Sequence, residues 1–224
     1  PFAMTGYSQG GYVASASSDL NANYHAWEVF NNSETELWIC DALQSDGTTP
    51  RYTGGITSSG GGVYQGPITT SSIPITGSGS ETISGEYIQV EFPFKFKLED
   101  IAYQREALFW GYNRLPHSGS IVACNDGINW KTIHNWTGLT DADVGSTDGS
   151  NLAVTQAPLR SGIFAVDKSG ATYDAYKFFR IICTRIHKTD TSGEGNSYGL
   201  WSIVQLELYG HRENDLVRLP DPTN

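Results

Sequence analysis

The sequence predicts an all-β protein built as a sandwich or a barrel. Helical signals are weak, because Gly, Ser and Thr are scattered throughout and few windows place apolar residues at i, i+3, i+4 and i+7. Gly makes up 25 of the 224 residues, well above the roughly 7% of an average protein. Short segments of alternating polarity, separated by turn residues, are frequent instead.

The first two strands come from alternating patterns. Residues 12–17 (YVASAS) alternate, and residues 86–92 (EYIQVEF) alternate more strongly. In the second segment Ile88, Val90 and Phe92 share one face, because successive side chains of a strand point to opposite sides. We expect this face to be buried.

A hairpin is predicted in the middle of the chain. Residues 120–124 (SIVAC) and 129–136 (NWKTIHNW) are separated by Asn125-Asp126-Gly127. This is a tight-turn signal, in which Gly127 can adopt a positive φ. The two segments should therefore pair as neighbouring antiparallel strands.

The last two strands differ in character. Residues 177–185 (KFFRIICTR) are apolar on both faces, which is typical of a central strand covered on two sides. Residues 202–209 (SIVQLELY) alternate and end before Gly210. Both should lie within the sheets.

Three stretches do not fit strands. Residues 41–85 are dense in Gly, Ser and Thr and read as a long insert that packs partly over the sandwich. Residues 140–151 (TDADVGSTDGSN) read as an acidic loop. Residues 212–224 contain two prolines and read as an extended tail or linker. We therefore expect one β-domain over residues 1–211, followed by the tail.

The composition argues against nucleic-acid-binding and membrane-inserting functions. Lys and Arg number 14 against 24 Asp and Glu, a formal net charge of −10, which argues against nucleic acid and against insertion into anionic membranes. Apolar runs are much shorter than the ~20 residues of a membrane span. The first residues lack a basic stretch followed by an apolar run, so no signal peptide is expected.

The three cysteines are expected to be buried free thiols without a catalytic or metal-binding role. The chain has an odd number of cysteines, Cys40, Cys124 and Cys183, so they cannot all form disulfides within the chain. No CxxC motif is present. Cys124 and Cys183 lie in strand-like runs, where a free cysteine acts as a small core side chain. Buried free thiols are the expected state.

No catalytic site is predicted. Residues 6–10 (GYSQG) match G-x-S-x-G, but the strand and helix that a nucleophile elbow needs do not flank them. The histidines are dispersed without metal-ligand spacing, and Asp141-Ala-Asp143 lacks the later ligands of an EF-hand. We expect a protein that is not an enzyme.

The order of the segments resembles the discoidin, or coagulation factor 5/8 type C, domains, which are galactose-binding-like jelly-roll sandwiches. The likeness spans roughly residues 10–210. The segments that carry it are, in chain order, Gly11–Ser18, Ala26–Asn32 with Trp38, Gly85–Pro93, Leu115–Pro116 with Ile121–Trp130, Tyr176–Ile181 and Ile203–Gly210. The resemblance implies a jelly-roll β-sandwich of two antiparallel sheets, here with the long insert at residues 41–85. The opening Pro1–Thr5 is also similar to discoidin-like domains in structural proteins of large viruses.

The resemblance implies a possible structural calcium. In the family, loop carbonyls, the Asp of Ala-Phe-Asp-Gly and a Glu near the last strand hold the ion. Here Asn31 stands at the Asp and Gln205 near the Glu, and two amides remove most of the charge that attracts calcium. Two interpretations stay open. The carbonyl of Phe30 with Asn31, Thr35 and Gln205 could hold calcium weakly, or the amides could hydrogen-bond the loop directly.

The resemblance also implies binding through the segments at one end of the sandwich. Sugars need aromatic faces and planar polar groups. The candidate ligand-binding residues are Arg51, Tyr52, Trp110, Tyr112, Asn113, Arg114, His117 and Trp201. Trp110–Arg114 is the most suggestive run, although Trp110 and Tyr112 could instead cap the core.

Two functions are compatible with these features. The first is a non-catalytic, lectin-like carbohydrate-binding or cell-adhesion module on an extracellular or virion surface, with a glycan or glycoprotein as partner. The second is a structural protein of a capsid, tail or filament, in which the sandwich contacts neighbouring subunits.

Overall fold

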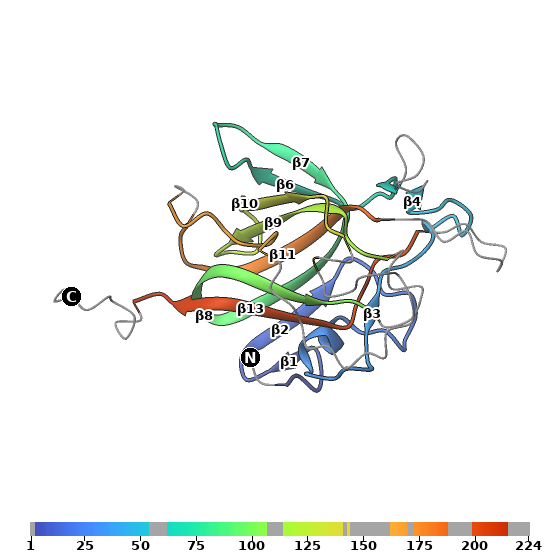
Figure 1. Cartoon of the computed structure of the whole chain (residues 1–224), viewed down its shortest axis with the longest axis horizontal. Helices are drawn as coiled ribbons and strands as arrows, with labels where there is room; N and C mark the ends of the chain where they lie inside the picture. The colour runs from blue at the N-terminus through green and yellow to red at the C-terminus, as the bar shows by residue number, and fades with distance from the viewer. Residues whose placement is uncertain are drawn as a thin grey trace.

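The computed structural model describes residues 3–53, 62–106, 114–140, 143, 162–169, 173–187 and 199–214. Within these ranges the chain is almost entirely β-structure, arranged as a sandwich (Figure 1). The all-β prediction is confirmed. No helix among the described residues is long and apolar enough to cross a membrane.

A single 3-10 helix, η1 (Ala26–Phe30), precedes most of the described strands. The strands, in chain order, are β1 (Ser8–Gln9), β2 (Tyr12–Ala16), β3 (Trp38–Ile39), β4 (Tyr52–Thr53), β5 (Val63–Tyr64), β6 (Thr69–Ile73), β7 (Glu81–Ser84), β8 (Glu86–Gln104), β9 (Ser118–Cys124), β10 (Trp130–Thr137), β11 (Tyr176–Arg185), β12 (Ser202–Ile203) and β13 (Gln205–Arg212).

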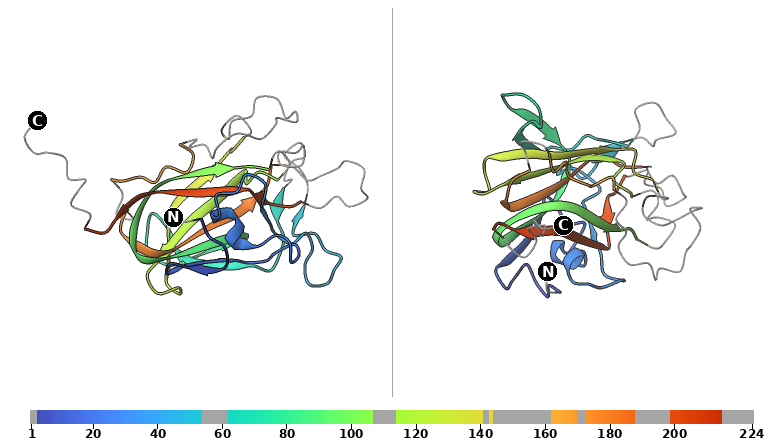
Figure 2. Two further views of the ribbon diagram at one scale, coloured as in Figure 1. Left: turned by 90° about the horizontal axis from the view of Figure 1, so that it is seen from below. Right: turned by 60° about the vertical axis from the view of Figure 1, so that its left-hand side comes forward.

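Strand β8 joins the two layers of the sandwich. It is 19 residues long and curves strongly (Figure 1; Figure 2, left). Its first part pairs with β2 and β11, for example Ile88 with Ala16 and Ile181. Its second part pairs with β13, from Phe96 with Arg212 to Gln104 with Gln205. The large sheet runs β1-β2-β8-β11-β9-β10-β6-β7, and β12 pairs with β3 in a small second sheet.

The core lies between these layers. Buried side chains of β8, β11, β12 and β13 meet there, and they include Ile88, Val90, Phe92, Phe179, Ile181, Cys183, Ile203 and Leu206. The first part of β8 and β11 contribute side by side from one sheet. Trp38 and Trp201 are fully buried and meet edge to face, with ring centroids 5.0 Å apart. Burying such large apolar surfaces supplies the main driving force for this fold.

Strand β11 is covered on both faces, as its sequence predicted. A second apolar cluster lies on the outer side of the sheet and contains Ile83, Val122, Cys124, Trp130 and Ile182. The β6–β7 hairpin contributes Ile83 to this cluster, and its strand β6 pairs in parallel with β10. The guanidinium of Arg180 stacks 3.8 Å from the ring centre of Tyr87 and 4.2 Å from that of Trp130, which adds cation–π attraction.

The expectation that residues 41–85 contain no strands is wrong. Four strands, β4 to β7, lie there, and β6 has alternating burial although it reads TTSSI. The buried hydroxyls have polar partners: Ser72 Oγ lies 2.6 Å from Thr132 Oγ1, and Thr70 Oγ1 accepts from Arg180. Paired hydroxyls can be buried at little cost, so a polar sequence can still form a covered strand.

Two further predictions are confirmed. β9 and β10 pair antiparallel around the Asn125-Asp126-Gly127 turn, where Gly127 has a φ of 76°. Cys40, Cys124 and Cys183 are free and buried, and burial raises the pKa of each thiol, which keeps them protonated. At the other end of the chain, β13 continues to Arg212, the residue at which the tail was expected to begin.

Candidate ligand-binding end of the sandwich

Residues of several described segments contact one another at one end of the sandwich. We call this the junction end, and it is defined by Thr53, Gly62, Glu106, Arg114, His117, His187 and Gly199. Thr53 is the last residue of β4, which lies at the right of Figure 1.

Backbone hydrogen bonds hold the junction end together. Gly62 N–H donates to Thr53 at 2.6 Å, and Ile186 N–H donates to Gly62 at 2.9 Å. His187 N–H donates to Leu115 at 2.9 Å. Gly62, Leu115 and His187 therefore lie close together, although they are distant in sequence.

An ion pair closes the segment that carries the predicted aromatic residues. Arg114 Nη1 donates to Glu106 Oε2 at 2.7 Å, and the side chains of Arg114 and Glu106 are only 17% and 14% exposed. The same carboxylate oxygen lies 3.4 Å from Ser202 Oγ. Glu106 thus links Arg114 to β12, the strand that follows Trp201.

Two histidines flank neighbouring strands at this end: His117 precedes β9 and His187 follows β11. The rings of His117 and His187 are 6.1 Å apart between centroids. His117 Nδ1 is 2.9 Å from Ser118 Oγ, which is itself 3.1 Å from Thr137 Oγ1. Burial lowers the pKa of His117, and the nearby charge of Arg185 lowers it further, so the ring is neutral at pH 7.

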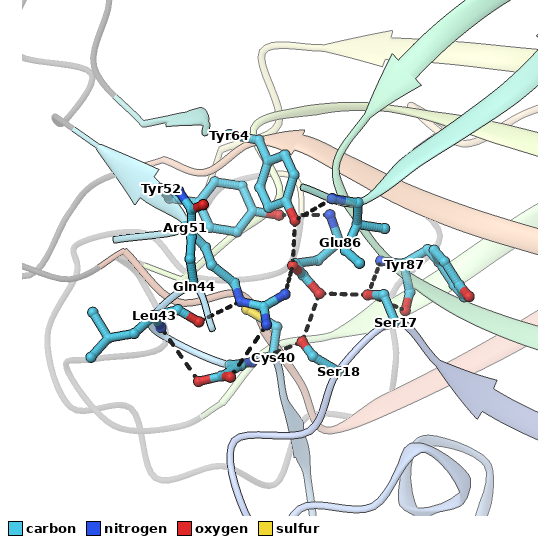
Figure 3. A network of polar contacts seen from close by, with 12 residues as sticks. Ser17, Ser18, Cys40, Leu43, Gln44, Arg51, Tyr52, Tyr64, Glu86 and Tyr87 are labelled. Carbon is cyan, nitrogen blue, oxygen red and sulfur yellow. Dashed lines mark hydrogen bonds and ion pairs between the residues drawn. The ribbon is translucent and has the colours of Figure 1, made fainter. Parts of the chain in front are cut away.

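A buried carboxylate network underlies the junction end (Figure 3). Glu86 is fully buried, and its two oxygens accept four hydrogen bonds. Oε1 accepts from Arg51 Nη1 at 2.5 Å and Tyr64 Oη at 2.6 Å. Oε2 accepts from Ser17 Oγ at 2.5 Å and Ser18 Oγ at 2.6 Å. The arrangement gives a buried charge the pairing that it requires.

The network fixes the insert to the sandwich. Arg51 also donates through Nε to the carbonyl of Leu43 at 2.7 Å and pairs with Asp41 at 3.3 Å. Burial raises the pKa of Tyr64, and the Glu86 carboxylate raises it further, so the phenol stays protonated and donates. Figure 3 shows Arg51 and Tyr64 reaching Glu86 from the side opposite to the serines.

The structure places the predicted ligand residues in two different environments. Arg114 and His117 lie together at the junction end and are partly exposed. Trp110, Tyr112 and Asn113 lie outside the described residues. The prediction that these five residues contact a ligand remains open, and the structure brings Arg114 and His117 to the root of the segment that contains the other three.

The other three predicted residues do not lie in open loops, and this corrects their assignment. Tyr52 and Trp201 are fully buried, and Tyr52 Oη donates to the Cys183 carbonyl at 2.8 Å. Arg51 is 9% exposed and its guanidinium is bound to Glu86. Side chains enclosed in this way hold the scaffold, because they cannot reach a ligand without leaving their partners.

Sequence reasoning missed Glu86 and Glu106. Glu86 is in phase with Ile88, Val90 and Phe92, so the period-two pattern already placed a charged residue on the buried face. That is a signal for a buried ion pair. Glu106 has no such signal, because only the fold brings it to Arg114.

The residues implied for calcium are already engaged with protein donors. The Phe30 carbonyl accepts from Met4 N–H at 3.0 Å, and Asn31 Oδ1 accepts from Ser33 N–H at 2.7 Å. Gln205 directs its NH2 group to Asn32 Oδ1 at 3.0 Å. An NH2 group is a donor and cannot ligate a cation. These residues do not fit a calcium ion, and no group of three or more His, Cys, Asp or Glu in the described part of the chain could hold a metal.

A cavity of about 400 Å³ lies beside Gln205, between β13 and residues of the N-terminal segment and of the turn after η1. Its lining includes Phe30, Asn32, Gln205, Glu207 and Tyr209. Glu207 accepts from Gln205 Nε2 at 3.2 Å and from the hydroxyl of Tyr209. This face of β13 is therefore polar and internally bonded.

Solved structures settle the fold. A putative chitobiase fragment from Bacteroides thetaiotaomicron has a TM-score of 0.51 to this chain at 10% identity, covering 91% of each chain. The chain therefore shares the β-sandwich fold of that fragment. The C-terminal domain of a chitobiase from Bacteroides fragilis is also similar, with 14% identity, a TM-score of 0.49 and coverage of 92% of this chain and 97% of that chain.

Discoidin-like sandwiches among the similar structures include sugar-binding modules. One is a family 32 carbohydrate-binding module from Clostridium perfringens NanJ, solved with galactose, at 14% identity and a TM-score of 0.43, covering 89% of this chain and 93% of that chain. Comparison with models of known protein families finds no match, and a sequence search of the curated proteins finds none at the level required.

Proposed function

We propose that this discoidin-like chain is a non-catalytic carbohydrate-binding module, and that its ligand site lies at the junction end. The observation that carries the proposal is the Glu106–Arg114 ion pair at the root of residues 107–113. This run contains two aromatic residues and an amide, Trp110, Tyr112 and Asn113. Aromatic faces with planar polar groups are the chemistry that binds sugar rings and hydroxyls.

The local electrostatics support a neutral ligand. Arg114 is neutralised by Glu106, and His117 is neutral at pH 7. A guanidinium bears five N–H donors, and only one of them, on Nη1, bonds to Glu106. The remaining donors are suited to hydroxyl groups, which accept hydrogen bonds without requiring a charge.

A glycan array tests the proposal, followed by titration of the sugars that bind. The wild type should give a saturable response to simple sugars. Arg114→Ala and Trp110→Ala should each weaken binding about tenfold or more, the equivalent of about 1.4 kcal/mol. Arg114→Lys should bind more weakly than the wild type as well, because Lys lacks the planar fork.

Arg212→Ala is the matched control. Arg212 lies seven residues along β13 from Gln205, a span of about 23 Å, and its guanidinium covers the ring of Phe94. Its removal changes net charge as Arg114→Ala does and should leave sugar binding unchanged. A wild-type array without any saturable sugar response would refute the function, and an unchanged profile for Arg114→Ala and Trp110→Ala would refute the site.

The extracellular or virion-surface location belongs to the same proposal and rests on the sequence resemblance. The alternative, a structural subunit, predicts self-association. Sedimentation of the purified chain over a range of concentrations separates the two. A monomer that binds sugar supports the module, and an assembly without sugar binding supports the structural subunit.

A further inference from the structure

We propose that a direct hydrogen bond between the side-chain amides of Gln205 and Asn32 closes the fold without a metal ion. It replaces the calcium that the discoidin resemblance implies at this place. The bond joins the turn after η1 to the start of β13, across 173 residues of sequence. This inference concerns closure of the fold and does not depend on the proposed sugar site.

Gln205 is built into this role. The residue is only 6% exposed. Its Nε2 donates to Asn32 Oδ1 at 3.0 Å and to Glu207 Oε1 at 3.2 Å. Both protons of the amide are therefore used. A neutral amide bonds in this way, whereas a carboxylate at position 205 would face Glu207 as a like charge.

Asn32 supplies the other half of the pair. It has a φ of 60°, in the left-handed region that favours glycine, and it stands where the family's Ala-Phe-Asp-Gly has its Gly. Asparagine is among the few other residues that adopt this conformation readily. It also brings a side-chain oxygen that glycine lacks. The change from Gly to Asn thus provides the acceptor, and the change from Glu to Gln provides the donor.

The neighbouring groups complete the closure without an ion. The carbonyl of Phe30 bonds to Met4, which ties down the N-terminal segment. Asn31 bonds through Oδ1 to Ser33 N–H and through Nδ2 to Glu36. Each of these groups bonds to a protein donor or acceptor, and calcium requires six to eight oxygen ligands at about 2.4 Å.

The adjoining cavity allows a calcium site to be created by mutation. The space of about 400 Å³ is lined by Gln205 and Glu207 and by Phe30 and Asn32, the sequence neighbours of Asn31, and it gives room for an ion if carboxylates are restored. We therefore expect the double substitution Asn31→Asp, Gln205→Glu to create a calcium site. The variant should be less stable than the wild type without calcium, because the amide bond is lost and like charges meet.

Thermal melting with calcium alone and with a chelator tests the proposal. The melting temperature of the wild type should be the same in both. That of Asn31→Asp, Gln205→Glu should rise with calcium in a saturable manner. The pair Asn23→Asp, Gln65→Glu makes the same chemical change at exposed positions and should show no such rise.

A double-mutant cycle tests the amide bond itself and applies even if the carboxylate variant fails to fold. Asn32→Gly keeps the backbone conformation and removes the acceptor, and Gln205→Ala removes the donor. The two should be coupled by roughly two- to tenfold in the unfolding equilibrium constant. A wild-type melting temperature that rises with calcium and falls with the chelator overturns the proposal, and so does a cycle without coupling.

Discussion

The two ends of this sandwich are held by hydrogen bonds that differ in the sequence separation of their partners. At the hairpin end, the turn Asn125–Asn129 between β9 and β10, the carboxylate of Asp126 accepts from the N–H groups of Ile128 and Asn129 at 2.9 and 2.8 Å. These partners lie two and three residues away. At the junction end, Glu86 holds Arg51 and Ser17 across 35 and 69 residues.

This difference teaches where function can be placed. A turn with local bonds forms by itself and needs little from the rest of the fold. Segments that start and finish at neighbouring points need long-range bonds to keep their ends in register. The junction end has such bonds, in the Glu86 network and the Glu106–Arg114 pair, and it can therefore carry ligand-binding segments on a fixed base.

The largest effect is expected at Glu86. Glu86→Ala removes the buried partner of the Arg51 guanidinium and leaves only the more exposed Asp41 at 3.3 Å, so we expect a loss of about 3 kcal/mol in the free energy of unfolding. Urea denaturation measures it. Glu91→Ala, on the same strand but half-exposed, should change stability by less than about 0.5 kcal/mol. A similar loss of unfolding free energy in both variants would show that the Glu86 network contributes no special stability at the junction end.

A smaller effect is expected at the hairpin end. Gly127 has a φ of 76°, and a Cβ there would meet only the Phe178 ring, at 3.9 Å. Gly127→Ala should therefore cost about 1–2 kcal/mol through the backbone alone, with sugar binding unchanged. Gly6→Ala is the control, since Gly6 has no positive φ and no atom within 4 Å. Loss of sugar binding in Gly127→Ala would contradict the independence of the two ends.

The smallest effect is expected from pH. Burial lowers the pKa of both His117 and His134 below the ordinary value of 6.5, although a bond to the Ile163 carbonyl opposes the shift at His134. The unfolded chain then binds more protons than the folded chain as pH falls below about 6.5. Stability should be full above that pH and decline below it. His117→Gln should decline less steeply, as followed by thermal melting, and an equal slope in both proteins would reject the assignment.

The same contrast between local and long-range bonds explains which features could be predicted from the sequence. The hairpin was visible in the sequence, because Asn125-Asp126-Gly127 and the alternation around it are local signals. The burial of Ile88, Val90 and Phe92 was visible for the same reason. The β6–β7 hairpin was not, because Thr70 and Ser72 are buried as paired hydroxyls, and a polar sequence does not reveal its distant partners.

The sequence by itself determined the strands outside residues 41–85, the turn at Gly127 and the state of the cysteines, since each depends on spacing between near neighbours. Only the tertiary structure decided that Arg51, Tyr52 and Trp201 serve the scaffold, while Arg114 and His117 lie at its open end. It also decided that Gln205 meets Asn32. The physical reason is that hydrogen bonds and ion pairs act over a few ångströms, and the partners here come together only when the sheets close.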